Sequence, residues 1–397
     1  MEQAASKQKQ VFGDRIQWMS VLIVLCFLSV LLLRSQSAAS YPTYVLSLFM
    51  LATFPKWRDV FRLHLVRLIC ALLIWLCLSV FWSDPFEWRA AISVWTRALL
   101  VFFFVVAMAE CQLRGQLQRW MGVALTVVGA GVVLVALVNF YATDPADGRL
   151  NGLGQLDTHV VAALVYGVIL LFVLRTATMF DSRGIKAAAL LVALIIAYAV
   201  FLSDSRNAWV SVTLGVVAYG LAYRAADWRQ FLVTLVGMGI LMGILVVALA
   251  FGDATAQMVL PRGSSFRPEI WGETLRLILE NDALLLGRGI LTSDDVMAGG
   301  VLMPHAHNIY LALVHQGGLV ALGLYIAVLA SAIINMFRNF DLADARLGAS
   351  ILIVATFSHL LDGHELIDKV GDTWLLVWMP VGLALGMSWT PGRGRGL

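Results

Sequence analysis

Side chains that could do acid–base chemistry gather late in the sequence. His305-Ala-His307-Asn308 stands just before a long apolar stretch, and His315 follows inside that stretch. A neutral imidazole is a suitable base near pH 7, and ionisable residues within apolar stretches usually face a polar cavity or a partner. The segment therefore predicts an imidazole base, with His307 and His305 both candidates.

A metal site is the competing interpretation of these histidines. His-x-His alone is weak evidence for a metal, and Asp294-Asp295 has no second acidic motif at a recognisable ligand spacing. We expect neither a metal nor another cofactor.

Arg267-Pro-Glu-Ile-Trp271 could supply an anion site. It opens an amphipathic stretch that runs to about residue 286, and Pro268 suits the first turn of a helix. Unpaired N–H groups, the helix dipole and a forked guanidinium would there favour phosphate, although an interfacial helix touching lipid headgroups is the alternative. We assign Arg267 and Trp271 to substrate binding. The expected apolar face holds Trp271, Leu275, Ile278 and Leu279.

Three further arginines are assigned to the substrate site. Arg206 ends Ser203-Asp-Ser-Arg206, a short turn, and Arg97 falls near the end of an apolar stretch. Arg149 precedes Gly152 and Gly154, glycines typical of a tight turn. A guanidinium buried at such places needs an anionic partner. The alternatives are a local pair with Asp204 for Arg206 and a structural ion pair for Arg97.

Membrane-spanning helices must position these residues. Of the 397 residues, 60% are hydrophobic and 13% are charged, and mean hydropathy is +0.84. A soluble protein has about 25% charged residues, so cytosolic enzymes, nucleic-acid binders and disordered proteins are excluded. The sequence predicts an all-α polytopic membrane protein with about twelve spans. They lie near 16–33, 42–55, 67–82, 92–109, 120–141, 159–174, 187–203, 207–223, 231–251, 307–336, 347–361 and 373–389.

Basic residues set the expected orientation. With the N-terminus inside, alternation of the spans places about two thirds of Lys and Arg, but only about a third of Asp and Glu, on the cytoplasmic side. We therefore expect both termini in the cytoplasm. Residues 1–251 would hold nine spans, 252–306 a long outer loop with amphipathic helices, and 307–397 the last three spans and a cytoplasmic C-terminus. Six histidines would then lie in the outer half: His159, His305, His307, His315, His359 and His364.

No phosphate-binding nucleotide motif is present in the sequence. A transfer reaction on the outer side must therefore draw its energy from an activated substrate. A lipid-linked diphosphate sugar suits the arginines, the base and the surrounding apolar helices.

The combination of these motifs resembles the O-antigen ligase and polymerase superfamily. The resemblance rests on Ser-x-Ser-Arg206, Arg267-x-x-x-Trp271 with Leu-Leu-Gly287-x-Gly289 downstream, and His307-Asn308 opening the next span. The family pattern of His-Asn, nine residues and Gly is met through Gly318, while its last position is Ala321 here. The motifs cover roughly residues 150–335.

This resemblance implies a membrane-embedded, GT-C-like glycosyltransferase that is inverting and metal-independent. A ligase of this kind moves O-antigen from undecaprenyl diphosphate to lipid A-core at the periplasmic face of a Gram-negative inner membrane, and needs no nucleotide or nucleic acid. Arg206 and Arg267 would hold the diphosphate, and His307 would deprotonate or orient the acceptor. His305 and Asn308 complete the expected site.

Three other functions stay open from the sequence. A polymerase or a protein O-oligosaccharyltransferase of the same superfamily would use the same donor with another acceptor. A lipid-linked glycan flippase would bind the same polyanionic lipid without chemistry, but no matching pair of Gly/Pro-interrupted helices marks the two halves.

Overall fold

The computed structural model describes residues 2–54, 57–225, 229, 266–363 and 365–389. Over these residues the chain is nearly all helical, and seven helices are long and apolar enough to cross a bilayer. The predicted polytopic α-helical membrane protein is thereby confirmed. The seven are α1 (Glu2–Leu32), α5 (His64–Ser79, continued by η1, Val80–Trp82), α6 (Trp88–Leu113), α7 (Gly122–Thr143), α8 (His159–Thr178), α9 (Arg183–Leu202) and α14 (Ile309–Arg338).

The remaining predicted spans within the described residues coincide with shorter or less apolar helices. These are α3 (Tyr41–Thr53), α10 (Arg206–Arg224), α15 (Ala343–His359), and η3 (Trp374–Trp378) continuing into α16 (Met379–Ser388). The predicted span 231–251 and residues 252–265 lie outside the described residues. Short helices α2 (Gln36–Ala39), α4 (Trp57–Phe61) and η2 (Leu117–Met121) connect the longer ones.

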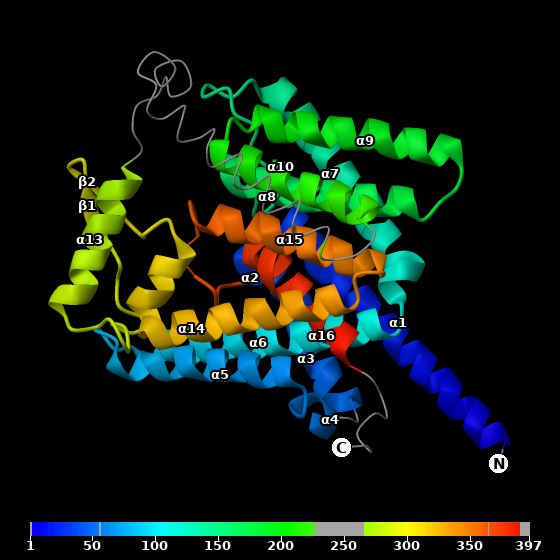
Figure 1. Ribbon diagram of the computed structural model, residues 1–397, viewed down its shortest axis with the longest axis horizontal. Helices are drawn as coiled ribbons and strands as arrows, with labels where there is room; N and C mark the ends of the chain where they lie inside the picture. Colours follow the sequence, from blue (N-terminus) through cyan, green and yellow to red (C-terminus); the bar gives the residue numbers. More distant parts are fainter. Residues whose placement is uncertain (1, 55–56, 226–228, 230–265, 364, 390–397) are drawn as a thin grey trace.

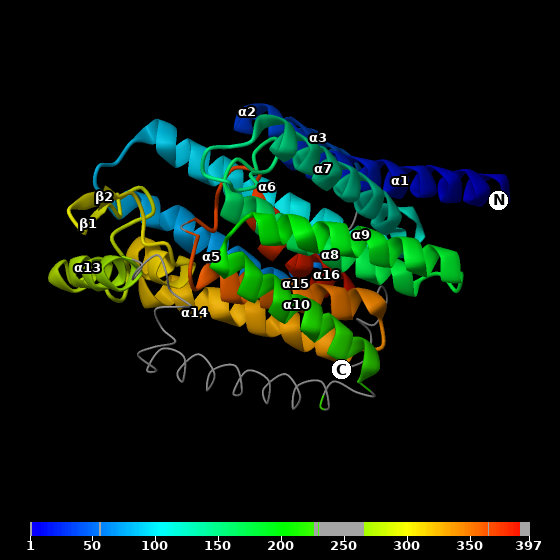
Figure 2. The ribbon, with the colours of Figure 1, turned by 90° about the horizontal axis from the view of Figure 1, so that it is seen from above.

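The long helices lie side by side, as both ribbon views show (Figures 1 and 2). The α16 helix packs against α6, α14 and α15, and every residue from 374 to 386 is buried. One end of this bundle carries α13 (Arg267–Glu280) and a hairpin of β1 (Val296–Ala298) and β2 (Val301–Met303). We call it the α13 end; α1 begins at the opposite end (Figure 1).

The α13 helix begins at Arg267 with Pro268 in its first turn, as predicted, but ends at Glu280 rather than near residue 286. Its buried face matches the predicted one only in part: Ile278 is buried and Trp271 half-buried, as expected. Ile270, Thr274 and Ile278 are buried, whereas Leu275 and Leu279 are about half exposed. The reason is the hairpin, which the sequence pattern did not predict and which packs on the Ile270 side of α13. The hairpin pairs Val296 with Met303, Met297 with Leu302 and Ala298 with Val301.

The α14 helix is broken at Gly318, whose backbone is left-handed (φ 69°). A break inside an apolar helix exposes amides and carbonyls that need new partners. The segment after α13 supplies them: Leu319 N donates to Leu284 O (2.9 Å), and Arg288 N donates to His315 O (2.6 Å). The two motifs of the sequence, Leu-Leu-Gly-x-Gly and the glycine of the His-Asn pattern, thus form one structural unit that fixes the start of α14.

Buried ion pairs fasten the bundle away from the α13 end. Arg175 Nε donates to Asp344 Oδ1 at 2.6 Å between α8 and α15, with both side chains essentially inaccessible. Arg15 pairs with Glu110 between α1 and α6. Removing one partner of such a pair typically costs about 3–5 kcal/mol, because the other charge stays buried.

Candidate active site at the α13 end

His307 faces a carboxylate from the opposite side of the site. His307 Nδ1 lies 3.2 Å from Asp362 Oδ1, and their side chains are 31% and 25% exposed. Asp362 belongs to the connection between α15 and η3, residues 360–373, which we call the α15–η3 loop. An Nδ1–H that donates to a carboxylate leaves Nε2 as the basic nitrogen. The pair therefore has the form of an oriented general base.

The backbone of His307 is itself unusual. Its φ of 48° is left-handed, a conformation that is uncommon for a residue with a side chain and costs roughly 1 kcal/mol. His307 N donates to His305 Nδ1 at 3.3 Å, and the two ring centroids are 3.9 Å apart. His305 thus supports the turn that orients His307.

Asn308 is the N-cap of α14. Its side-chain oxygen accepts from Tyr310 N (3.0 Å) and Leu311 N (3.1 Å), and its Nδ2 donates to Leu360 O at 3.2 Å. A cap satisfies amides that the first turn leaves unpaired. Asn308 therefore both begins the helix and ties it to the α15–η3 loop, a positioning role.

The first turn of α13 packs against the same two segments, the α15–η3 loop and the residues before α14. We call this group around His307, Asp362 and Arg267 the catalytic corner. Arg267 Nε donates to Leu361 O at 2.8 Å, and Trp271 Nε1 donates to Ala306 O at 3.1 Å. The terminal amino groups of Arg267 form no hydrogen bond or ion pair with another described residue. The half-buried guanidinium of Arg267 is thus bonded to Leu361, the residue that precedes Asp362 in the chain. Its two terminal amino groups are available to donate to an anion.

Asp362 stays ionised in this setting. Burial by itself raises the pKa of its carboxyl, but the hydrogen bond from His307, the N–H of Gly363 and electrostatic attraction to His307 and His305 together hold the pKa below the ordinary 3.8. A carboxylate that is always charged can stabilise an imidazolium when His307 takes a proton.

Arg206 lies at the same end of the bundle but does not contact His307. It is the first residue of α10, it is exposed, and its side chain makes no hydrogen bond or ion pair with another described residue. The next residue, Asn207, donates through Nδ2 to Ser358 O at 3.1 Å, just before the α15–η3 loop. Arg206 thus lies near the start of that loop, and its guanidinium has no hydrogen bond or ion pair with another described residue.

Arg149 has partners of its own, and one of them, His159, lies within electrostatic reach of Asp362. Arg149 Nη1 lies 3.3 Å from His159 Nε2, and Arg149 Nε lies 3.7 Å from Asp204 Oδ2. The alternative pair of Arg206 with Asp204 is therefore not formed, because Asp204 faces Arg149.

Arg97 is paired on another stretch of the α15–η3 loop. Its Nη1 lies 3.6 Å from both Glu365 Oε2 and Asp368 Oδ1. The structural ion pair considered from the sequence is present. Arg97 stands apart from the catalytic corner, and a contact with substrate there stays a proposal.

Two other histidines expected in the outer half, His315 and His359, form no hydrogen bond with the His307–Asp362 pair in the part of the chain that the structure describes. His315 is fully buried in α14 with Nε2 3.4 Å from Arg288 Nη1, and His359 is buried at the end of α15. His364 lies outside the described residues. Across the part of the chain that the structure describes, no three His, Cys, Asp or Glu side chains gather as metal ligands.

Asp362 is the residue that the sequence analysis missed. It follows the predicted span 347–361 directly, at Asp362-Gly363-His364, so its place after an apolar stretch was a usable signal. Its partner, however, is 55 residues away in the chain, and no spacing rule links a loop carboxylate to an imidazole at that distance.

Comparison with known proteins indicates one family. Residues 189–326 match the model of a protein family described as O-antigen ligase. The matched segment contains Arg206, Arg267, Trp271 and His307, while Asp362 lies beyond it. The chain is also 28% identical over 313 residues to an O-antigen ligase of Pseudomonas aeruginosa, covering 78% of this chain and 74% of that protein. By these matches and the order of its motifs, this multi-pass membrane protein is similar to the O-antigen ligase family.

Proposed function

We propose that this protein is an O-antigen ligase, which transfers the glycan of an undecaprenyl-diphosphate-linked O-antigen to a sugar of lipid A-core. The observation that carries the proposal is the His307–Asp362 pair beside Arg267, whose terminal amino groups are uncommitted. Similarity to the O-antigen ligase family, which implies glycosyl transfer from a lipid-linked glycan, and to a curated ligase supports the choice of reaction.

We further propose twelve spans, with both termini in the cytoplasm of a Gram-negative cell and the α13 end in the periplasm. The bias of Lys and Arg toward the opposite end supports this orientation. Nine spans would precede the long outer segment 252–306, and three would follow it. Sugars attached to a lipid on the outer leaflet could then reach His307 without leaving the membrane surface.

In the proposed reaction, His307 acts on the acceptor. Nε2 of His307 takes the proton of an acceptor hydroxyl while that oxygen attacks the anomeric carbon of the donor glycan. The bond between this carbon and the diphosphate oxygen breaks, so the configuration inverts and undecaprenyl diphosphate leaves with the bonding electrons. Asp362 holds the Nδ1–H and stabilises the imidazolium, as carboxylates do in other His-based acid–base systems.

The arginines act on the leaving group. Charge builds up on the departing diphosphate, and fixed cationic donors aimed at it usually give the largest single contribution to the rate. Arg267 presents a fork whose orientation is set by the bond from its Nε to Leu361 O. Arg206 presents a second guanidinium from the start of α10. Neither role needs a metal ion, so we propose that transfer is metal-independent.

The test is reconstitution of the purified protein with an undecaprenyl-diphosphate-linked glycan and lipid A-core, in excess chelator and without nucleotide. Lipopolysaccharide of lower mobility on a gel is the expected product. It should disappear in Arg267→Ala and His307→Ala, and persist in Arg276→Ala. Arg276 is a matched control because it lies on the exposed face of the same helix, paired with Glu273 and Glu280.

Other products would overturn the ligase assignment in distinct ways. Lengthened lipid-linked glycan without modified lipid A-core would identify a polymerase. Glycan on an added acceptor protein would identify a protein O-oligosaccharyltransferase. Movement of the donor across the membrane without any covalent product would identify a flippase, and transfer that chelator abolishes would contradict metal independence.

A further inference from the structure

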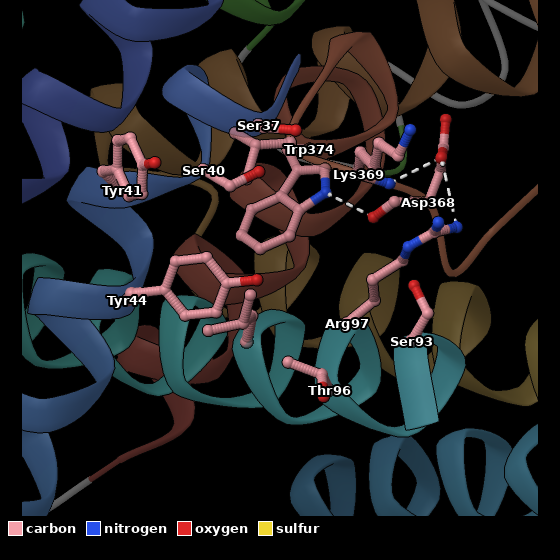
Figure 3. A pocket seen from close by; sticks show the side chains of 12 residues that line it. Ser37, Ser40, Tyr41, Tyr44, Ser93, Thr96, Arg97, Asp368, Lys369 and Trp374 are labelled. Atoms are coloured by element: carbon pink, nitrogen blue, oxygen red, sulfur yellow. Dashed lines mark hydrogen bonds and ion pairs between the residues drawn. The ribbon is translucent and has the colours of Figure 1, made fainter. Parts of the chain in front are cut away.

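A cavity of about 340 Å³ lies beside the second half of the α15–η3 loop, lined by Asp368, Lys369 and Val370 from that loop. It lies between α2–α3, the first half of α6 and residues 368–374 (Figure 3). A second cavity of about 450 Å³ adjoins it between the start of α6, residues 290–291 and residues 365–367. Both are lined by Ser93 and Arg97, so the two form one continuous polar surface along α6.

Hydroxyl groups and aromatic rings dominate the lining of the first cavity. Tyr41 and Tyr44 reach it from α3, and Ser93 and Thr96 from α6, facing the indole of Trp374 across the cavity (Figure 3). The hydroxyls of Tyr41, Tyr44 and Ser93 form no hydrogen bond with another described residue. Flat rings beside groups that both donate and accept suit a sugar, which has apolar C–H faces and a rim of hydroxyls.

The charges of this surface favour a neutral ligand over a phosphate. Arg97 lies 3.6 Å from each of Glu365 and Asp368. Lys369 Nζ donates to Gln36 Oε1 at 3.0 Å. With Arg89 and Glu87 of the second cavity, three cations and three carboxylates line this surface and balance, and an anion at Arg97 would also meet two carboxylates. A hydroxyl can instead donate to Asp368 and accept from Arg97 at once.

The cavity is joined to the catalytic corner by a short piece of chain. Asp362 pairs with His307, and Asp368, six residues later, pairs with Arg97. Six residues span at most about 20 Å. A ligand several sugars long could therefore rest in the cavity while one of its hydroxyls lies at His307.

We propose that this cavity is a glycan-binding subsite that holds a neutral, polyhydroxylated stretch of the acceptor oligosaccharide. The identity of the ligand as the acceptor rests on the proposed ligase function. The arginines at the catalytic corner take the charged donor, and the cavity takes sugars that carry no leaving group. The single α15–η3 loop thus aligns the two substrates.

Binding can be measured without any chemistry. The probe is the water-soluble core oligosaccharide freed of lipid A, titrated against the full chain in phosphatidylcholine nanodiscs by calorimetry. We expect saturable binding that weakens at least tenfold in Tyr44→Ala and in Asp368→Asn, which change two different elements. Tyr223→Ala is the matched control, since Tyr223 is an exposed tyrosine in the last turn of α10, and this variant should bind like the unaltered protein.

Two results would overturn the subsite. One is that the core oligosaccharide does not bind the unaltered protein, or binds both Tyr44→Ala and Asp368→Asn as tightly as the unaltered protein. The other is displacement of the bound oligosaccharide by glycerophosphocholine alone, which would make the cavity a lipid-headgroup site.

Kinetics separates this inference from the proposed function. In the transfer assay, the cavity variants should raise KM for the acceptor at least tenfold and leave kcat and the donor KM within about twofold. Normal transfer with an unchanged acceptor KM would refute the subsite and leave the ligase intact. Oligosaccharide binding that depends on Tyr44 and Asp368, in a protein that transfers nothing, would support the subsite and refute the ligase.

Discussion

His307 and Asp362 meet at 3.2 Å although they enter the site from two different connections, one before α14 and one after α15. His307 is fixed by its left-handed backbone and its bond to His305, and Asp362 by the N–H of Gly363 at 2.9 Å. The pair is therefore held from both sides. Its geometry follows from the packing of α14 against α15. The proposed activation of the acceptor hydroxyl depends on this geometry.

Replacing Asp362 with Asn should lower kcat by between about 10- and 10⁴-fold, because an amide neither selects the Nδ1–H tautomer nor stabilises the imidazolium. Both KM values should change little, since Asp362 does not contact substrate in the proposed reaction. Steady-state transfer assays measure this, with Glu273→Gln on exposed α13 as the control. An Asp362→Asn protein with wild-type kcat would remove the oriented base from the mechanism.

The two neighbouring histidines should respond unequally to substitution. His307→Ala deletes the base and should reduce transfer by about 10²–10⁴-fold. His305→Ala deletes a group that accepts from the His307 amide, so a loss of about tenfold is expected. Transfer rates of the two variants, measured side by side, distinguish the roles. A larger loss of transfer in His305→Ala than in His307→Ala would make His305 the base.

Helices and motifs of this protein could be read from the sequence because they depend on local properties. Apolar length predicted the seven long helices, Pro268 marked the start of α13, and Asn308 marked the start of α14. Each of these features is encoded within a few neighbouring residues. The shared end of Arg267, Trp271, His305, His307 and Asn308 then followed from topology.

Features that depend on contacts between distant segments could not be read in this way. The apolar pattern of α13 is compatible with burial on either of two adjacent faces, and the face that is buried is selected by the unpredicted hairpin at Ile270 and by α14 at Ile278. Asp362 looked like an ordinary outer carboxylate until packing of α15 against α14 placed it on His307. The partners of Arg97 and Arg149 were likewise set by tertiary contacts and not by their own sequence surroundings.

Arg267→Lys should retain little activity. Lysine keeps the charge but loses both the fork that fits a diphosphate and the Nε that donates to Leu361 O. A loss of about 10²–10³-fold in kcat is expected, in line with the removal of one fixed donor to a developing anion. Arg276→Lys, two turns along the exposed face of α13, should be neutral in the same assay. Full activity of Arg267→Lys would contradict the two-point contact with the diphosphate.

Asp372 should make stability depend on pH. Burial, followed by the charges of Asp368 and Asp362, raises the pKa of the Asp372 carboxyl from 3.8 to about 6. The folded state therefore binds more protons than the unfolded state between these values, so stability falls as pH rises from about 4 to 6 and stays lower above that.

Asp372→Asn mimics the protonated form and should remove this dependence. At pH 7.5 it should raise the free energy of unfolding by at most about 3 kcal/mol, and near pH 4 the gain should vanish. Thermal unfolding of the protein in nanodiscs at the two pH values measures the difference. Asp341→Asn, at an exposed position beyond the other end of α14, serves as the control. Equal gains at both pH values would show that the effect does not come from titration of Asp372.

Gly318→Ala should destabilise the fold without altering a reacting group. The left-handed backbone at Gly318 is strained for any residue with a side chain, and a Cβ there would overlap the backbone of Leu285. Either α14 or the clamp after α13 must then shift, and His307 would shift with it. We expect an apparent Tm lower by several degrees together with reduced transfer. Gly323→Ala lies one turn further along the same helix, where a Cβ meets nothing within 4 Å, and should be neutral or slightly stabilising. Equal behaviour of the two variants would mean that the break in α14 does not need glycine and does not hold the site in place.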